Sequence, residues 1–312
     1  HYQAKGAAMT ALYPFRPDFY RQMGYGYGRK INQYRVSPAN LPTGPRQNVT
    51  FLDETHQQAF NDCYDRLMAA GNGLMSQPAH TVTTLFTQSS LQKVGYWANG
   101  KLQGYLLFSF EPVSDDNFLR NNIEVRTLLY ENSTALRGLL ALLRAQEHQI
   151  ETIVFNTQDE DFHLLLDDPR NGSHNLMPSI YHESNTQGVG IMYRVIDVPR
   201  LFELLAGHNF GGQSITVQLN LRDSFWPTCD GEWVLVVTPD SWGNGRITLN
   251  PNATPDVAIG LDIADFSSLI MGATTFRQLL AYGLADISNP AYADAVHALF
   301  YTPNKPICHT AF

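Results

Sequence analysis

The chain has 312 residues, of which 44% are hydrophobic and 16% charged, and its formal net charge is −8 at pH 7. This length predicts two or three domains, each able to bury its own core. The excess of acidic residues and the lack of Lys/Arg runs argue against a nucleic-acid-binding surface. The sequence has no run of about 18 apolar residues, so we expect no membrane span. Three widely spaced cysteines favour the reduced thiols of a cytoplasmic protein, namely Cys63, Cys229 and Cys308.

The first segment contains the sequence ALYPFRPDFYRQMGYGYG at residues 11–28. It predicts the end of a strand, a short helix and a second strand, because its two prolines suit only a helix start. Gly24 suits the left-handed position that follows a helix end. Residues 31–36 are predicted to be extended, and three prolines and one glycine at 37–48 predict a linker.

Residues 46–209 have an α/β pattern. An Asn-Gly pair near residue 100 predicts a tight hairpin between two strands. Further on, a strand is followed by a leucine-rich helix, capped by Asn132 or Ser133, and by a strand at 151–157. This succession predicts a βαβ unit with its helix packed on a sheet.

Residues 210–312 change character. The segment 214–222 alternates apolar and polar residues, which predicts a half-buried strand, and two further strands follow. Gly272 and Gly283 are placed as helix stops. The three helices are expected near 263–271, 274–282 and 290–300. Strands followed by helices indicate an α+β domain, and a proline-containing tail begins at Tyr301.

The stretch ALYPFRPDFYRQMGYGYG resembles the segment that closes the first acetyltransferase domain of the enhanced intracellular survival (Eis) proteins. These are GNAT-type N-acetyltransferases with two GNAT-like domains followed by a sterol-carrier-like domain. The order of the other regions agrees, so the resemblance covers essentially the whole chain. It implies α/β and α+β folds: GNAT-like mixed sheets with flanking helices, then a sterol-carrier-like α+β domain. The implied domains are the C-terminal part of a first GNAT domain at 1–45, a second GNAT-like domain at 46–209, and the sterol-carrier-like domain at 210–312.

The resemblance implies acetyl-CoA as co-substrate. A GNAT domain holds it with an Arg/Gln-x-x-Gly-x-Gly/Ala loop, whose backbone amides cradle the pyrophosphate. That loop is expected upstream of residue 11, where the chain has only ten residues. The crossover LLYENSTALRG of the second domain has no glycine before Gly138, and side-chain-bearing residues keep amides away from a phosphate. We therefore expect the CoA-binding loop among residues that precede His1.

Tyr25 is the first candidate catalytic residue. Acetyl transfer needs an acid for the departing thiolate, and a phenol with a pKa of about 10 suits a thiolate with a pKa of about 8.5. The resemblance assigns this role to the tyrosine after the helix-stop glycine, which is Tyr25. Without the resemblance, a tyrosine in such a turn indicates core packing. Tyr27 points to the same face and is the competing candidate, whereas Tyr20 lies inside the helix and is expected to be structural.

Phe312 is the second candidate. The resemblance implies that the terminal carboxylate, carried by a C-terminal phenylalanine, acts as the general base in the active site. Two other clusters have simpler interpretations. The acidic residues around Asp159 are adjacent rather than spaced to converge on a metal, so we expect a solvated loop and no metal site. Cys308 and His309 are neighbours in an extended tail and point apart, which disfavours a nucleophile pair.

These observations predict an acetyl-CoA-dependent N-acetyltransferase acting on amines of small molecules or on exposed lysines. The alternative is a lipid- or acyl-binding module, in which the sterol-carrier-like domain lines a tunnel and the GNAT-like parts form a scaffold. The tunnel residues would be Phe266, Leu269, Ile270, Phe276, Leu279 and Leu280. We expect no nucleic-acid or membrane partner and a cytoplasmic location. The resemblance also implies a homo-oligomer, with the hexamer as the family's assembly.

Overall fold

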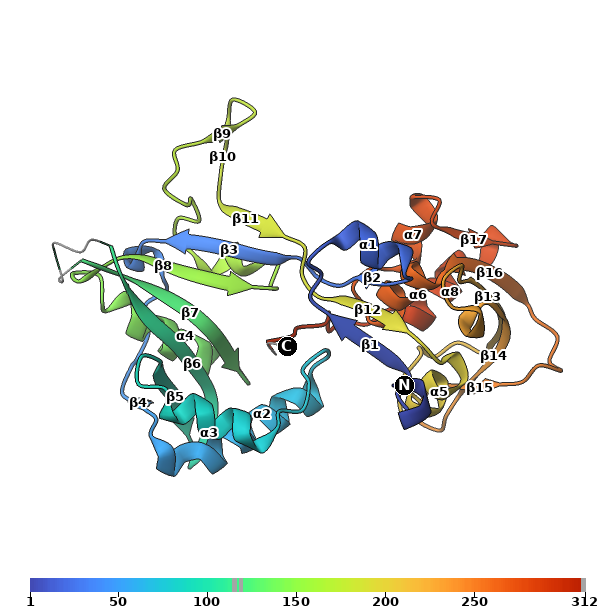
Figure 1. The fold of residues 1–312 in the computed structure, drawn as a ribbon, viewed down its shortest axis with the longest axis horizontal. Helices are drawn as coiled ribbons and strands as arrows, with labels where there is room; N and C mark the ends of the chain where they lie inside the picture. Colours follow the sequence, from blue (N-terminus) through green and yellow to red (C-terminus); the bar gives the residue numbers. More distant parts are fainter. Residues whose placement is uncertain (114–116, 118–119, 310–312) are drawn as a thin grey trace. The chain divides into compact units, whose positions relative to one another are not determined.

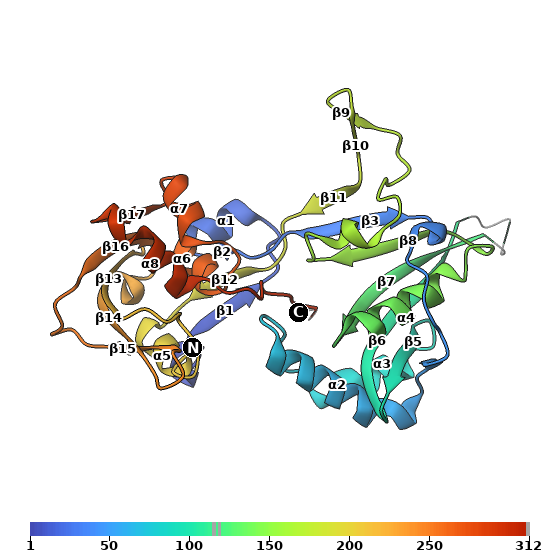
Figure 2. The same ribbon diagram turned by 180° about the vertical axis from the view of Figure 1, so that it is seen from behind.

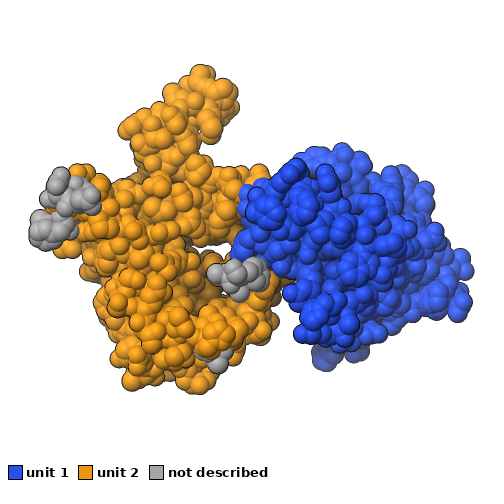
Figure 3. Space-filling model, viewed as in Figure 1, with its two compact units in different colours: residues 1–29, 189–306, 312 blue, residues 30–188, 307–311 orange. Residues whose placement is uncertain are grey.

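The computed structural model describes residues 1–113, 117 and 120–309, which form two compact units (Figure 3). Among these residues, unit 1 contains 1–29 and 189–306, and unit 2 contains 30–188 and 307–309. The cuts between the units differ from the predicted boundaries at 45/46 and 209/210. Compact units and family domains are different divisions of a chain, so those boundaries stay predictions. No helix of the described residues is long and apolar enough to cross a membrane.

Unit 2 is built on a seven-stranded sheet with the order β11-β3-β8-β7-β6-β5-β4 (Figure 1). The strands are β3 (Ile31–Val36), β4 (Val49–Phe51), β5 (Gln92–Ala98), β6 (Lys101–Pro112), β7 (Asn121–Tyr130), β8 (Ile150–Thr157) and β11 (Asn185–Gly188). β7 and β8 are parallel, and the other neighbouring pairs are antiparallel. Asn99 and Gly100 have φ of 52° and 71°, which confirms the tight hairpin between β5 and β6.

Helices cover both faces of this sheet. α2 (Gln57–Ala70) and α3 (Ala79–Thr87) pack on one face, and α4 (Ser133–Arg144) packs on β5, β6 and β7 from the other. The Asn132 side chain accepts a hydrogen bond from the Ala135 amide and so caps α4. The β7-α4-β8 succession confirms the predicted βαβ unit, with Asn132 rather than Ser133 as its cap.

A small hairpin projects from unit 2 between β8 and β11 (Figures 1 and 2). It consists of β9 (Leu176–Met177) and β10 (Tyr181–His182), which pair with each other in a two-stranded sheet. Four large apolar side chains of this hairpin are at least half exposed, namely those of Leu176, Met177, Ile180 and Tyr181.

Unit 1 begins with a three-stranded antiparallel sheet of order β1-β12-β2. Its strands are β1 (Met9–Leu12), β2 (Gly26–Tyr27) and β12 (Met192–Val195), and α1 (Pro17–Gln22) lies between β1 and β2 in sequence. This arrangement confirms the strand, helix and strand predicted for residues 11–28, and β3 confirms the extended segment predicted for residues 31–36.

The remainder of unit 1 is a five-stranded sheet, β15-β14-β13-β16-β17, covered by helices. The strands are β13 (Ile215–Arg222), β14 (Gly231–Pro239), β15 (Gly245–Leu249), β16 (Val257–Asp262) and β17 (Ala285–Ile287). The helices are α5 (Val198–Leu204), α6 (Ile263–Ile270), α7 (Phe276–Ala281) and α8 (Ala293–Phe300). Gly272 and Gly283 have φ of 72° and 68°, which confirms them as helix stops.

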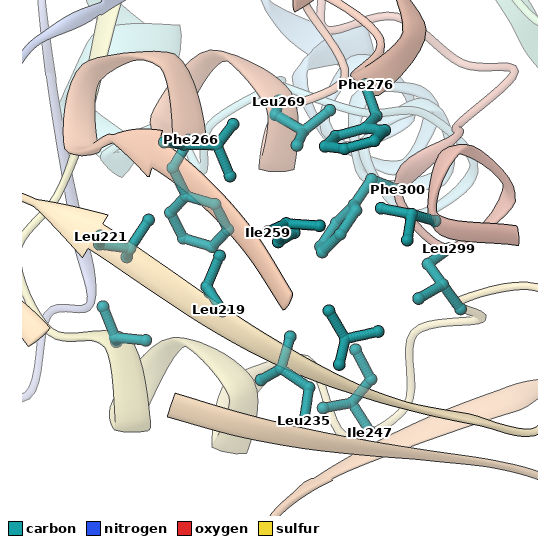
Figure 4. Packing of buried hydrophobic residues seen from close by; sticks show 14 of the residues in the cluster. Leu219, Leu221, Leu235, Ile247, Ile259, Phe266, Leu269, Phe276, Leu299 and Phe300 are labelled. Carbon is teal, nitrogen blue, oxygen red and sulfur yellow. The ribbon is translucent and has the colours of Figure 1, made fainter. Parts of the chain in front are cut away.

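The core of this part lies between the five-stranded sheet and its helices. Figure 4 shows side chains of the sheet, such as Leu219 and Leu235, pointing toward Phe266 of α6 and Phe276 of α7. The predicted strands-then-helices α+β fold is thus confirmed, beside the α/β sheet of unit 2. Four of the proposed tunnel residues are members of this packed core, namely Phe266, Leu269, Phe276 and Leu279.

Candidate active site

The Tyr25 backbone is held by the end of α1. Gly24 has a φ of 79°, the left-handed conformation that glycine adopts without strain. The Gly24 amide donates to the Arg21 carbonyl and the Tyr25 amide donates to the Tyr20 carbonyl, both at 3.0 Å. These two bonds are the Schellman closure of a helix, so the direction in which Tyr25 leaves α1 is fixed locally.

The Tyr25 side chain is half-buried and has two defined neighbours. Its phenol oxygen lies 3.0 Å from Oγ1 of Thr10 in β1, and its ring meets the Tyr20 ring edge-on at a centroid distance of 5.7 Å. A hydroxyl that donates to the phenol oxygen leaves the phenol proton available for another acceptor. The same hydroxyl would stabilise the phenolate that remains once this proton has left.

Tyr27 and Tyr20 differ from Tyr25 in their surroundings. Tyr27 lies in β2, is 43% exposed and has the Arg21 guanidinium 5.7 Å from its ring centroid. Tyr20 lies inside α1, where its ring contacts the rings of Phe15, Phe19 and Tyr25. Of the three phenols, the Tyr25 phenol is the one with a hydroxyl partner on a neighbouring strand.

A buried ion pair supports the turn from β12. The Arg194 guanidinium donates to Asp223 at 2.6 Å, and the two side chains are only 3% and 1% exposed. Asp223 also accepts from the backbone amides of Phe225 and Trp226. The guanidinium further donates to the carbonyl of Met23, the residue before Gly24. A buried charge pair with these additional hydrogen bonds holds a rigid geometry.

Gly24 is required sterically as well as conformationally. A Cβ at Gly24 would lie 1.6 Å from Arg194 Nη1, so a side chain there would displace the guanidinium. The Arg194 pair therefore determines where the end of α1 lies, and through it where Tyr25 lies.

The C-terminal tail is placed on unit 2 as far as residue 309. The Ile307 amide donates to the Asn72 carbonyl at 2.8 Å, and the Cys308 amide donates to the Gln158 side chain at 2.7 Å. Gln158 directly follows β8 and is 3% exposed. Phe312, the second candidate residue, lies outside the described residues.

Judged by its solvent-exposed area, His309 in this tail is half-buried. The atoms around its imidazole nevertheless desolvate the ring enough to lower the pKa of His309 to about 4. The imidazole is therefore neutral at neutral pH when the tail is docked. Cys308 and His309 follow each other along this docked segment.

The crossover between β7 and α4 does not fit the pyrophosphate of CoA. Asn132 Oδ1 already accepts from the Ala135 amide at the helix N-terminus. The preceding residue, Glu131, adds a carboxylate, which pairs with Arg66 at 2.7 Å. A negative charge and a side-chain cap occupy the position where a phosphate-binding turn offers free amides. We therefore assign CoA binding to no residue of this crossover.

β7 and β8 separate beyond Val125 and Phe155, where their pairing stops. β7 continues to Tyr130 and β8 to Thr157 without further bonds between them. Gln158, which holds the Cys308 amide, follows the end of β8 at this opening. The tail is thus anchored where the two parallel strands diverge.

The acidic loop near Asp159 makes local contacts. Asp159 accepts from the Asp161 amide at 3.0 Å, which is a turn within the loop. Among the residues that the structure describes, no group of three or more His, Cys, Asp or Glu side chains could hold a metal ion. The absence of a metal in the reaction stays a prediction.

Comparison with known proteins identifies two domains in the chain. Residues 79–195 match the model of an acetyltransferase (GNAT) domain, and residues 198–309 match the model of a sterol carrier protein domain. The chain thus combines a GNAT acetyltransferase domain with a sterol carrier protein domain. The predicted resemblance to Eis-type proteins is thereby confirmed at the level of the domain combination.

Individual relatives agree with this placement. An uncharacterized N-acetyltransferase of Streptomyces griseus is 25% identical over 218 residues, covering 69% of this chain and 47% of the relative. The chain thus spans about half the length of the curated relatives it matches. The crystal structure of a GCN5-related N-acetyltransferase from Anabaena variabilis has a TM-score of 0.78 at 18% identity, covering 99% of this chain and 74% of that one. Eis1 from Mycobacterium abscessus has a TM-score of 0.73 at 20% identity, covering 99% and 75%. These structures show a shared fold.

Three residues around Tyr25 were missed by sequence reasoning: Thr10, Arg194 and Asp223. Thr10 and Arg194 are register partners on β1 and β12, although 184 positions separate them in the sequence. A usable signal existed for Arg194, because an arginine inside the apolar run IMYRVI indicates a buried cation that needs a partner. No local signal identified Thr10.

Proposed function

We propose that the full-length protein is an acetyl-CoA-dependent N-acetyltransferase that acts on amines of small molecules or on exposed lysines. The observation that carries this function is the Tyr25 phenol, held 3.0 Å from Thr10 Oγ1 in a turn closed by Gly24. A phenol placed in this way has a fixed position, a hydroxyl that stabilises its anion, and a proton available for transfer. The matched GNAT acetyltransferase domain supports the reaction class in which such a proton is needed.

The chemistry follows from these groups. A neutral amine nitrogen attacks the thioester carbonyl carbon, a C–N bond forms and the C–S bond breaks. The departing thiolate takes the Tyr25 proton, and Thr10 stabilises the resulting phenolate until a proton is restored. Before the attack, the terminal carboxylate of Phe312 takes the proton that the ammonium must lose and releases it to solvent. The attacking nitrogen loses a second proton as the amide forms, and this proton restores the Tyr25 phenol. Protons balance, because the neutral amine loses one proton and the thiolate gains one.

Lipid binding by the sterol carrier protein domain is the weaker candidate. Phe266, Leu269 and Phe276, which would line a tunnel, are fully buried in the packed core of that domain. An acyl chain in their midst would have to displace well-packed side chains, which is costly. Native mass spectrometry of the purified protein tests this alternative, since a co-purified lipid adds a defined mass.

We also propose that the protein is a cytoplasmic homo-oligomer. The β9–β10 hairpin supports association, because Leu176, Ile180 and Tyr181 expose apolar surface in water. A second copy of the chain is the partner that the family suggests. Light scattering of the wild type and of Ile180→Asp measures the mass, and a monomeric wild type would contradict the oligomer.

The acetylation assay is the central test. The full-length protein is mixed with acetyl-CoA and a panel of amines, and free thiol is measured for the wild type, Tyr25→Phe and Tyr27→Phe. Removal of a general acid typically lowers turnover by about 10²–10⁴-fold, and we expect this for Tyr25→Phe only. Reduced turnover in Tyr27→Phe together with normal turnover in Tyr25→Phe would assign the acid role to Tyr27 instead of Tyr25. An inactive wild type with every amine would contradict acetyl transfer.

A further inference from the structure

Helix α6 of the sterol carrier protein domain is buried on all its sides. It packs against β13 and β16 of its own sheet and against β2 and β12 of the sheet that adjoins Tyr25. Three of its buried residues are polar, namely Asp265, Ser267 and Ser268. Burying polar groups costs free energy unless they are hydrogen-bonded, so each needs a partner, and these partners reveal what α6 contacts.

Asp265 is paired with the helix that precedes Tyr25. Its Oδ1 accepts from Arg21 Nη2 at 2.6 Å, and Asp265 is only 5% exposed. Arg21 lies in the last turn of α1, and its carbonyl accepts the Gly24 amide that closes the turn. The carboxylate therefore holds, through one arginine, the residue on which the turn closes.

Gly26 brings the backbone after Tyr25 into direct contact with α6. A Cβ at Gly26 would lie 2.0 Å from the Ala264 carbonyl oxygen and 2.4 Å from Ser268 Oγ. Only a residue without a side chain fits this approach. The strand that carries the Tyr25 backbone onward thus rests on α6 with no flexible side chain between them.

Ser267 connects α6 to β12. Its hydroxyl donates to the Ile263 carbonyl at 2.7 Å and accepts from the Val195 amide at 2.9 Å. Val195 follows Arg194, whose guanidinium donates to the Met23 carbonyl. The turn is therefore held from two directions, through Asp265 to Arg21 and through Ser267 to β12.

We infer that α6 is a structural part of the acid site and that Asp265 is a positioning residue for Tyr25. A helix used only for packing would be apolar on the side that faces β2. This inference rests on the proposed function, in which Tyr25 is the acid. A misplacement of about 1 Å at a reacting group can lower turnover by about 100-fold. The sterol carrier protein domain, which contains α6, would therefore affect kcat by fixing the position of the Tyr25 phenol.

The test uses Asp265→Asn, which keeps the shape and removes the charge. Asp294→Asn is the matched control, because Asp294 is also paired with an arginine, Arg277, but is exposed on α8. Hydrogen exchange of the amides in residues 20–27 is measured first and needs no substrate. We expect faster exchange in Asp265→Asn and the wild-type rate in Asp294→Asn. Wild-type exchange in a folded Asp265→Asn protein would overturn the inference.

Turnover is then measured in the full-length enzyme. Asp265→Asn is expected to lower kcat by about 10-fold to 100-fold while KM for acetyl-CoA stays unchanged. In the Tyr25→Phe background the same substitution should have no further effect, because the group that it positions is gone. An equal loss of kcat in the wild-type and Tyr25→Phe backgrounds would show that Asp265 has only a general structural role. Should Asp265→Asn fail to fold, Arg21→Gln replaces it, with Arg277→Gln as control.

The proposed function and the positioning role of Asp265 can be contradicted independently of each other. An enzyme without acetyl transfer, combined with faster exchange in Asp265→Asn, contradicts the proposed function and leaves the positioning contact intact. Normal wild-type turnover together with unchanged kcat in Asp265→Asn contradicts the inference alone.

Discussion

The phenol oxygen of Tyr25 lies 3.0 Å from Oγ1 of Thr10, which joins the turn after α1 to strand β1. Thr10 is also the register partner of Arg194 on β12, whose guanidinium contacts the Met23 carbonyl. One strand pair thus holds both the backbone and the side chain of the proposed acid.

We expect Thr10→Val to lower kcat because valine has the shape of threonine but no hydroxyl for the phenolate. A hydrogen bond to a charged group contributes about 1.5–3 kcal/mol, which corresponds to about 10-fold to 150-fold in rate. Steady-state kinetics of the full-length enzyme measures this. In Tyr25→Phe, which has no phenol oxygen, Thr10→Val should change nothing further, and a loss there would point to a different role for Thr10.

Gly26→Ala should be strongly destabilising. Its Cβ would lie 2.0 Å from the Ala264 carbonyl oxygen, and backbone atoms of a buried helix cannot move away cheaply. Overpacking of this kind costs about 1–3 kcal/mol or more in free energy of unfolding. Thermal unfolding compares it with Gly207→Ala, where a Cβ meets nothing within 4 Å. Equal melting temperatures for the two variants would show that β2 can separate from α6.

Local signals in the sequence were sufficient for the turn itself. Pro17 at the first position of α1 and Gly24 after the helix predicted where the helix begins and ends, and Asn99-Gly100 predicted the hairpin. These features depend on the conformational preferences of single residues. They therefore form independently of the tertiary contacts that the rest of the chain makes.

The support of Tyr25 could not be predicted in the same way. In the sequence IADFSSLI, Asp265 and the two serines would indicate a solvent-facing side of a helix, yet the structure buries all three. Asp265 and Arg21 are 244 positions apart, and their contact exists only because α6 packs between two sheets. Such a contact depends on tertiary packing, which the sequence periodicity of a single segment does not predict.

The docked tail should loosen as the pH falls. Burial lowers the pKa of His309 to about 4, below the value of about 6.5 for a free imidazole. Above pH 6.5 both the docked and the released tail carry neutral His309, so docking has its full strength. Between about pH 6.5 and 4 the released tail binds a proton that the docked tail does not, and docking weakens.

Hydrogen exchange at Ile307 and Cys308 reports this release, because both amides donate hydrogen bonds only when the tail is docked. After correction for intrinsic rates, protection should fall from pH 7.5 to 5 in the wild type and stay constant in His309→Phe. Gln158→Leu should release the tail at every pH, whereas the exposed Gln149→Leu should not. Constant protection in the wild type would contradict the role of His309.

The 312-residue chain should bind acetyl-CoA no more tightly than a control without a phosphate site. Asn132 caps α4 and Glu131 adds a negative charge where a phosphate-binding turn would offer amides. Calorimetry with the purified chain measures the affinity. Micromolar binding that Arg66→Ala and Asn132→Gly leave unchanged would indicate a CoA site elsewhere in this chain. Binding that these substitutions alter would place it at the β7–α4 crossover.

Deletion of Phe312, or residues appended after it, should suppress acetyl transfer and leave CoA affinity nearly unchanged. An ammonium with a pKa near 10 is mostly charged at neutral pH, so a base must accept its proton before attack. A terminal carboxylate has a pKa of about 3.5 in water, and partial burial raises it and makes it a better base. Phe312→Ala, which keeps a terminal carboxylate, should retain most of the turnover, and an N-terminal tag of the same length controls for bulk. A C-terminally tagged enzyme with full activity would remove the terminal carboxylate from the mechanism.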